Sequence, residues 1–159
     1  MHDAGPGRMA RRSVKAVAKK PRLVEYASKE PSAFAEMLGG LIEANVLARA
    51  EKKKDFDILK ARVGIWVTDI DEGVTLVFDA GILTVYNGLE PKRTITIRAE
   101  AATVMSLSNL KIGVLGLPVY YDGVGRDVAL KLLRGKLQIE GMLPNIATLN
   151  RVTRIFSVQ

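Results

Sequence analysis

Two groups of acidic residues are the places where this chain could do chemistry. Asp69, Asp71 and Glu72 stand close together in an acidic turn, and carboxylates are ligands that hard cations prefer. The turn lacks the further oxygen ligands and the central glycine of a calcium loop, so a hairpin turn is the simpler interpretation. Asp122 and Asp127 could form an acid and base pair, but their surroundings are typical of a turn followed by a helix start.

The remaining residue types exclude most other catalytic sites. The chain has no cysteine and one histidine, His2, which lies next to the terminus. Thiolate chemistry, cysteine zinc sites and histidine-based triads therefore have no support in the sequence. The motifs of phosphate-binding loops, nucleophile elbows and dinucleotide folds are also missing. We expect no catalytic residues, no metal and no cofactor. Support for an enzyme would require that replacing Asp122 or Asp127 abolishes an activity while the protein stays folded.

The elements that surround these residues belong to a chain of ordinary globular composition. Its 159 residues are 48% hydrophobic and 26% charged, which predicts one folded domain with a real core. No uninterrupted apolar run reaches the roughly 18 residues of a transmembrane helix. The absence of cysteine fits a reducing compartment, and we expect a cytoplasmic protein.

The net charge of +7 is concentrated in a short N-terminal segment. Residues 1–22 contain seven basic residues against the single acid Asp3, whereas residues 23–159 have a net charge of +1. We therefore divide the chain into a basic tail, 1–22, and a domain, 23–159, and expect no nucleic-acid partner. The tail is a solubilising extension, a transit peptide or a peripheral contact with an anionic membrane. The membrane-docking candidates are Arg8, Arg11, Arg12, Lys15, Lys19, Lys20 and Arg22.

The first half of the domain predicts one helix followed by four strands. Apolar residues recur at three- and four-residue steps from Pro31 to Lys53, which predicts an amphipathic helix ending in the solvated run 52–54. Gly39 and Gly40 inside it suggest close packing against another backbone, or a bend. From Ile58 the apolar period changes to two, and short turns separate strands at 58–70, 74–79, 82–86 and 93–98. Sequential strands with short links predict antiparallel pairing.

The second half predicts three helices and one further strand. Helical spacing covers 99–110 and 125–134, a fifth strand covers 136–140, and a last helix starts near Pro144. The predicted fold class is therefore α+β, with a five-stranded antiparallel sheet covered on one face by helices.

This order of elements resembles the sterol-carrier-protein-type lipid-transfer domain over residues 34–156. The matching strings are Val77-Phe78-Asp79 before Gly81, the strand at 94–97 that leads into a helix, and the sequence GKLQIEG at 135–141. The resemblance implies a five-stranded sheet whose helices enclose an apolar tunnel. It also implies non-catalytic binding of sterols, fatty acyl groups or other lipids, and some bacterial relatives assist isoprenoid quinone synthesis. The segment 110–124 is longer and more apolar than the link expected there.

The candidate lipid-binding residues are ordinary hydrophobic side chains, because a lipid site works by burying apolar surface. Each of them could equally fill the core of the domain. The segment 112–121 is a candidate flap over a pocket mouth, a membrane- or partner-contacting lip, a buried strand or a subunit contact. The predicted lining residues are Val104, Met105, Leu107, Leu110, Ile112, Val114, Leu115, Leu117, Leu130, Leu133 and Phe156.

These observations lead us to expect an intracellular, sterol-carrier-like protein that binds or transports a sterol, fatty acyl or isoprenoid-like ligand in a hydrophobic cavity. Two alternatives remain open. The same fold could serve as a protein-interaction or regulatory module with a filled core, or as an enzyme or an accessory domain for an enzyme of lipid or quinone metabolism. An oligomer is possible in each case.

Overall fold

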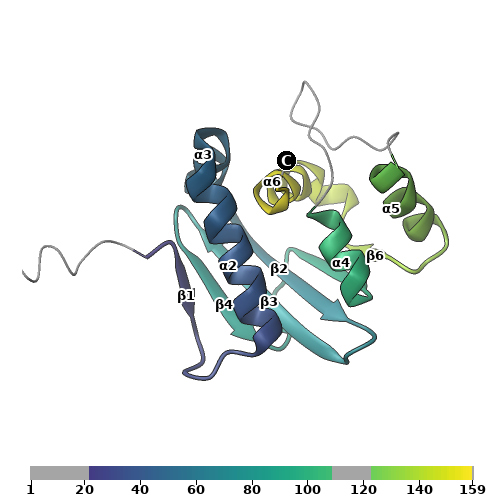
Figure 1. The fold of residues 1–159 in the computed structure, drawn as a ribbon, viewed down its shortest axis with the longest axis horizontal. Helices are drawn as coiled ribbons and strands as arrows, with labels where there is room; N and C mark the ends of the chain where they lie inside the picture. Colours follow the sequence, from purple (N-terminus) through teal and green to yellow (C-terminus); the bar gives the residue numbers. More distant parts are fainter. Residues whose placement is uncertain (1–21, 109–122, 159) are drawn as a thin grey trace, which may run out of the picture.

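The computed structural model describes residues 22–108 and 123–158, which form a six-stranded sheet with helices on one face. The strands are β1 (Val24–Tyr26), β2 (Lys60–Val67), β3 (Glu72–Asp79), β4 (Leu83–Asn87), β5 (Ile95–Ala99) and β6 (Gln138–Glu140). The helices are α2 (Ala33–Ala48), α3 (Ala50–Ile58), α4 (Ala101–Leu107), α5 (Gly123–Leu133) and α6 (Ile146–Phe156), with a short 3-10 turn at Leu143–Asn145 before α6. Figure 1 shows how these elements are arranged.

The predicted α+β class is confirmed, but the sheet is mixed and has six strands rather than five antiparallel ones. Its order is β1-β4-β3-β2-β5-β6, and the pairs β1/β4 and β2/β5 are parallel. Strand β1 was not predicted, because three residues are too few to show an alternation of apolar and polar side chains. The other five strands match their predicted segments to within a few residues, although Glu72 and Gly73, expected in a turn, already belong to β3.

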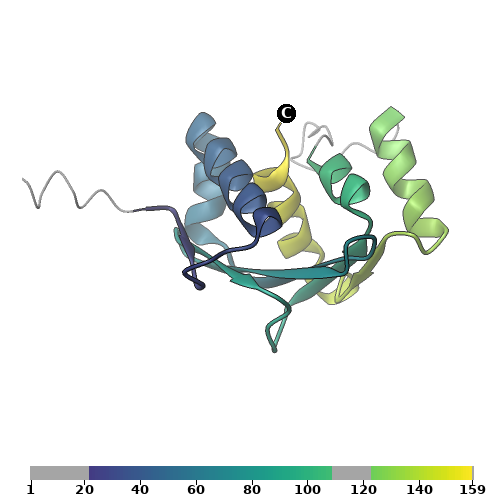
Figure 2. The same ribbon diagram turned by 60° about the horizontal axis from the view of Figure 1, so that its bottom comes forward.

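The parallel pairing of β2 and β5 follows from the path of the chain after β4. Residues 88–94 cross the outer face of the sheet instead of turning back along β4. Thr75 Oγ1 on β3 donates to the carbonyl of Gly88 at 2.8 Å and accepts from the backbone N–H of Glu90 at 2.8 Å. The chain therefore passes β3 and β2 before it enters β5 in the direction of β2, and the crossing loop projects below the sheet in Figure 2.

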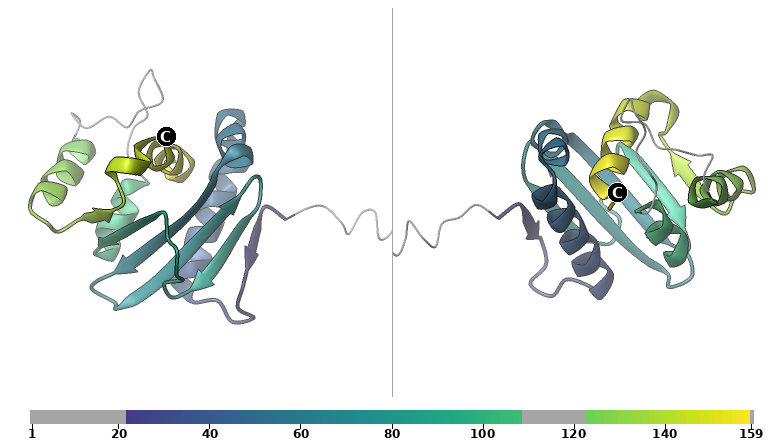
Figure 3. Two further views of the ribbon diagram at one scale, coloured as in Figure 1. Left: turned by 180° about the vertical axis from the view of Figure 1, so that it is seen from behind. Right: turned by 45° about the horizontal axis from the view of Figure 1, so that its top comes forward.

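The core lies between the sheet and the helix layer (Figures 2 and 3). Alternate residues of the strands face the helices and are buried, as the period-two pattern predicts. Phe56 of α3 packs edge-on against Phe78 of β3, with ring centroids 6.2 Å apart. The inward-facing strand residues are Ala61, Val63, Ile65, Val67, Val74, Leu76, Phe78, Leu83, Val85, Ile95, Ile97 and Ala99.

The single helix predicted over 31–53 is two helices. Arg49 has an extended backbone that ends α2 and begins α3. An unbroken helix through Ile58 would be about 39 Å long, whereas an eight-residue strand spans about 27 Å, so the break keeps the chain over the sheet. Ser32 caps α2, its hydroxyl accepting from the N–H of Ala35 at 3.1 Å. Gly39 packs closely against side chains of β1 rather than against the predicted backbone, since a Cβ there would stand 2.5 Å from Tyr26 Oη, while Gly40 has open space.

The N-terminal tail lies almost entirely outside the described residues. Arg22 is described and is exposed. The other membrane-docking candidates, and the segment 109–122 with its predicted flap, are not described, so these predictions stay untested. No helix within 22–108 and 123–158 has the length and apolar character needed to cross a membrane.

Candidate functional site

The predicted lipid-binding residues belong to α4, α5 and α6, which cover the β5 end of the sheet (Figure 2). Val104 of α4 and Phe156 of α6 are buried in the core. Met105 and Leu107 of α4 are half-buried, while Leu130 of α5 is 47% exposed. The structure thus places buried and half-buried side chains of α4 and α6, and an exposed side chain of α5, in one part of the helix layer. The predicted positions Leu110, Ile112, Val114, Leu115 and Leu117, and the side chain of Leu133, lie outside what the structure describes.

A carboxylate from the acidic turn positions α4. Asp69 Oδ1, between β2 and β3, accepts a hydrogen bond from the N–H of Ala101, the first residue of the helix, at 2.9 Å. This satisfies one of the donors left free at a helix start. Asp69 therefore has a structural role, and the part of the chain that the structure describes holds no group of three or more acidic or histidine side chains suited to a metal.

α5 is attached to α4 through Lys131. Its ammonium donates to Thr103 Oγ1 at 3.1 Å and pairs with Asp127 Oδ2 at 3.2 Å one turn earlier on α5. The Asp127 side chain is 53% exposed, so this ion pair contributes little to stability. Asp127, one half of the candidate acid and base pair, is thus engaged with a lysine of its own helix.

α6 lies between two groups of helices, α2 and α3 on one side and α4 and α5 on the other (Figure 3). Polar side chains fix it to the first group. Asn45 of α2 donates to the carbonyls of Ile155 and Phe156, at 3.2 and 2.9 Å, and so satisfies acceptors at the end of α6. Lys52 of α3 donates to the carbonyl of Ser157, just beyond the helix.

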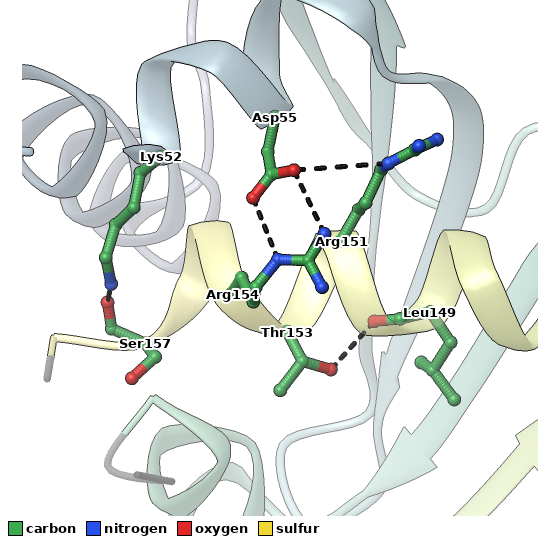
Figure 4. Close-up of polar contacts among 7 residues, drawn as sticks. All are labelled: Lys52, Asp55, Leu149, Arg151, Thr153, Arg154 and Ser157. Carbon is green, nitrogen blue, oxygen red and sulfur yellow. Dashed lines mark hydrogen bonds and ion pairs between the residues drawn. The ribbon is translucent and has the colours of Figure 1, made fainter. Parts of the chain in front are cut away.

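An ion pair completes this attachment (Figure 4). Arg154 of α6 holds Asp55 of α3 through two hydrogen bonds, Nε to Oδ2 at 2.8 Å and Nη2 to Oδ1 at 3.0 Å. The Asp55 and Arg154 side chains are 17% and 23% exposed. Arg151 approaches the same carboxylate at 4.0 Å. The hydrogen bond that Arg154 donates to Asp55 raises the pKa of Arg154 further above its ordinary value, so the guanidinium stays charged.

The prediction of a solvated helix end at residues 52–54 is wrong for Lys52. Helix α3 continues to Ile58, and Lys52 is 6% exposed. Burial lowers the pKa of its ammonium, and the positive charge of Arg49 adds to that effect. The sequence analysis also missed Asn45 and Asp55. Asn45 had a visible signal, because it stands on the apolar stripe of α2 between Ile42 and Val46.

On the other side of α6, a backbone bond joins the residues that follow α6 and α4. The N–H of Val158 donates to the carbonyl of Ser108, the residue that ends α4, at 2.7 Å. This bond brings the end of α6 beside the point where residues 109–122 begin. Val152 and Phe156 of α6 and Val104 of α4 belong to one continuous apolar cluster. A space opened between α6 and α4 would therefore be lined by hydrocarbon.

The fold is shared with known proteins. No family model and no curated protein match the sequence. A solved ubiquinone synthesis protein, UbiJ-SCP2, is similar over 77% of this chain and 90% of its own length, with a TM-score of 0.54 and 15% identity. A crystal structure of sterol carrier protein 2 matches 79% of this chain and 92% of its own, with a TM-score of 0.48 and 12% identity. A Thermus thermophilus protein described as possibly a sterol carrier protein matches 83% and 92%, with a TM-score of 0.42 and 13% identity.

The chain is therefore an α+β domain with the sterol-carrier-protein fold. The resemblance that the sequence suggested is confirmed at the level of the fold.

Proposed function

We propose that this domain binds a lipid of the sterol, fatty acyl or isoprenoid class without covalent change, and presents or transfers it. The ligand lies between the sheet and helices α4, α5 and α6. The observation that supports this most directly is the asymmetry of α6. Its side chains make polar contacts with helices α2 and α3 on one side, while toward α4 the described polar link is the backbone bond of Val158 with Ser108, beside the apolar residues Val152 and Phe156. A lipid entering on the apolar side would displace hydrocarbon contacts and leave the hydrogen bonds to α2 and α3 intact.

The residues assigned to the ligand follow from their burial. Val104 and Phe156 form the inner wall, and Met105, Leu107 and Leu130 form the rim. A ligand that buries roughly 500 Å² of apolar surface gains about 12.5 kcal/mol, and subtracting about 4 kcal/mol for its lost freedom, the low end of that cost, leaves about 8.5 kcal/mol, which corresponds to a micromolar Kd. Binding in the micromolar range therefore needs no polar anchor. The predicted lining residues within 109–122 lie outside the described residues and stay a prediction.

The absence of a covalent step is part of the proposal. It is supported by the structural use of the acidic side chains that could have served as catalysts. Asp69 caps α4 and Asp127 pairs with Lys131. A carrier needs only that its ligand be held and released.

The test combines native mass spectrometry of the full chain after bacterial expression with displacement of a fluorescent fatty-acyl probe. Replacing Leu107 with tryptophan puts a larger side chain at the half-buried rim, and we expect at least about a tenfold loss of probe affinity with an unchanged melting temperature. Met37→Trp is the matched control, because Met37 is a half-exposed residue of α2 away from α4.

Co-purified lipid and a selective loss in Leu107→Trp would support the carrier. A protein that carries no lipid and ignores the probe would overturn the proposal and favour an interaction module. Equal affinities for Leu107→Trp, Met37→Trp and the unmodified chain would place the ligand elsewhere.

A further inference from the structure

The outer face of α2 is apolar although the described fold leaves it uncovered. Every fourth or third residue along this face is small or apolar, and Met37 and Leu47 are 40% and 68% exposed. The opposite face of the helix is buried in the core. An exposed apolar surface of this kind normally marks an interaction site. The exposed residues of this surface, which we call the α2 outer face, are Ala33, Met37, Gly40, Ala44, Leu47 and Ala48.

The charges beside the α2 outer face are negative. Glu36 and Glu43 are the two charged residues of α2, and both lie toward β1. The Tyr26 hydroxyl of β1 donates to the carbonyl of Glu36 at 3.3 Å. Glu36 and Glu43 stand three residues before and four residues after Gly39, whose Cβ position faces Tyr26 and Val24 of β1, so both carboxylates are on that face of α2. Burial raises the pKa of the Tyr26 phenol, and the negative charges of Glu36 and Glu43 raise it further. A partner for this surface should therefore be apolar on one side and basic on the other.

The chain itself contains such a segment. At 100° per residue, the basic residues of 8–20 gather on one side of a helix, with only Lys20 off that side. The opposite side carries Met9, Ala10, Ser13, Val14, Ala16 and Val17, with Lys20 at its C-terminal end. These side chains are small enough to approach the surface near Gly40 and Ala44 closely. The basic side carries Arg8, Arg11, Arg12, Lys15 and Lys19.

The path of the chain brings residues 8–20 close to the α2 outer face. Arg22 leads directly into β1, and a Cβ at Gly39 on α2 would be 3.1 Å from Val24. The chain before residue 22 therefore starts beside α2, on the side where Glu36 and Glu43 lie. Thirteen residues of helix are about 20 Å long, which fits along the 24 Å or so of α2. A short tether also raises the effective concentration to about the millimolar range, so weak contacts suffice.

We propose that residues 8–20 dock on the α2 outer face of their own chain as an amphipathic helix. Their apolar side covers the small and apolar residues of α2, and their arginine and lysine side chains meet Glu36 and Glu43. The tail is then an intramolecular cover for this surface. This proposal is independent of the lipid site, which lies at the α4 end of the helix layer.

Paramagnetic relaxation tests the docking in the full chain. Because the protein has no cysteine, Met9→Cys places a single nitroxide label at the edge of the apolar side of the tail. We expect strong broadening of the amide signals of Ala33 and Met37, and little effect on β6. Replacing Arg12 and Lys15 with glutamate should lower the docked population by roughly tenfold. Adding Glu36→Lys and Glu43→Lys to that variant should restore the broadening.

The matched control reverses two acids at the opposite end of the fold, Glu100→Lys with Glu140→Lys, and should leave the broadening unchanged. Absence of broadening on α2 in the unmodified sequence would overturn the proposal. Broadening that arises between labelled and unlabelled copies would identify a second copy as the occupant and also overturn it. The proposal would also be overturned if the label became immobilised only when vesicles of anionic lipid were added, because the tail would then bind a membrane.

Discussion

Replacing Asp55 with asparagine should destabilise the domain through Arg154. Asp55 is 17% exposed and makes two hydrogen bonds to the Arg154 guanidinium, so the variant leaves a partly buried arginine without its carboxylate. Breaking a fully buried pair in this way costs about 3–5 kcal/mol. Solvent reaches both side chains here, and we reduce the figure to roughly 1.5–3 kcal/mol.

A second effect acts in the opposite direction. Asp55 lies in the last turn of α3, where a negative charge opposes the helix dipole, and removing it returns about 0.3–0.5 kcal/mol. The net loss of unfolding free energy should therefore be about 1–2.5 kcal/mol. For a domain of this size that corresponds to a fall in melting temperature of roughly 4–10 °C.

The control is a second aspartate of the same helix. Asp57 pairs with Lys53, but the Asp57 side chain is 46% exposed, so Asp57→Asn should change the unfolding free energy by no more than about 0.5 kcal/mol. Urea unfolding of both variants, and of a double-mutant cycle with Arg154→Gln, measures the difference. A coupling energy near zero between Asp55 and Arg154, or equal losses for Asp55→Asn and Asp57→Asn, would refute the reasoning.

Two further changes act on the backbone and on a buried charge. Gly141→Ala should reduce the unfolding free energy, measured by urea titration, by at least about 2 kcal/mol more than Gly135→Ala does. Both glycines have positive φ, but only at Gly141 would a Cβ overlap the carbonyl oxygen of Thr94. Equal losses of unfolding free energy in the two variants would contradict this prediction, because the backbone around Gly141 would then have moved to make room for the Cβ. For Lys52, whose pKa burial lowers from 10.5, the folded state loses its proton before the unfolded state does, so stability rises with pH over the interval between the lowered value and 10.5. The difference in unfolding free energy between the unmodified chain and Lys52→Met should therefore grow in favour of the lysine as the pH is raised through that interval, and a constant difference would contradict a buried ammonium.

The sequence predicts the elements of this fold better than it predicts their connection. Alternation of apolar and polar residues is a local property, and it located β2 to β6 because one face of each strand is buried against helices. The direction of β5 depends on where residues 88–94 run. Thr75 fixes that path through two hydrogen bonds to residues 13 and 15 positions away, and no pattern within β4 or β5 records it.

The candidate site shows the same division. The apolar faces of α4 and α6 could be predicted, and Val104 and Phe156 are buried as core residues would be. The attachment of α6 could not be predicted. Lys52 and its acceptor on Ser157 are 105 residues apart, and Asp55 and Arg154 are 99 apart, so each side chain resembles an ordinary surface charge until the fold pairs it. Asn45 is the exception, since an amide on an apolar stripe needs a partner wherever the stripe is buried.

The long-range polar contacts of α6 also bear on how this fold could be stable and still bind the proposed lipid. Buried polar groups need partners with fixed geometry, so Asn45 and Asp55 define one position for α6 over the sheet. Apolar contacts have no such directional requirement. The ends of α4 and α6 are joined by one bond of this directional kind, from the N–H of Val158 to the carbonyl of Ser108. The proposed lipid could therefore separate α4 from α6 only by breaking this bond or by leaving the two helix ends joined at it, while the polar contacts of α6 with α2 and α3 stay made.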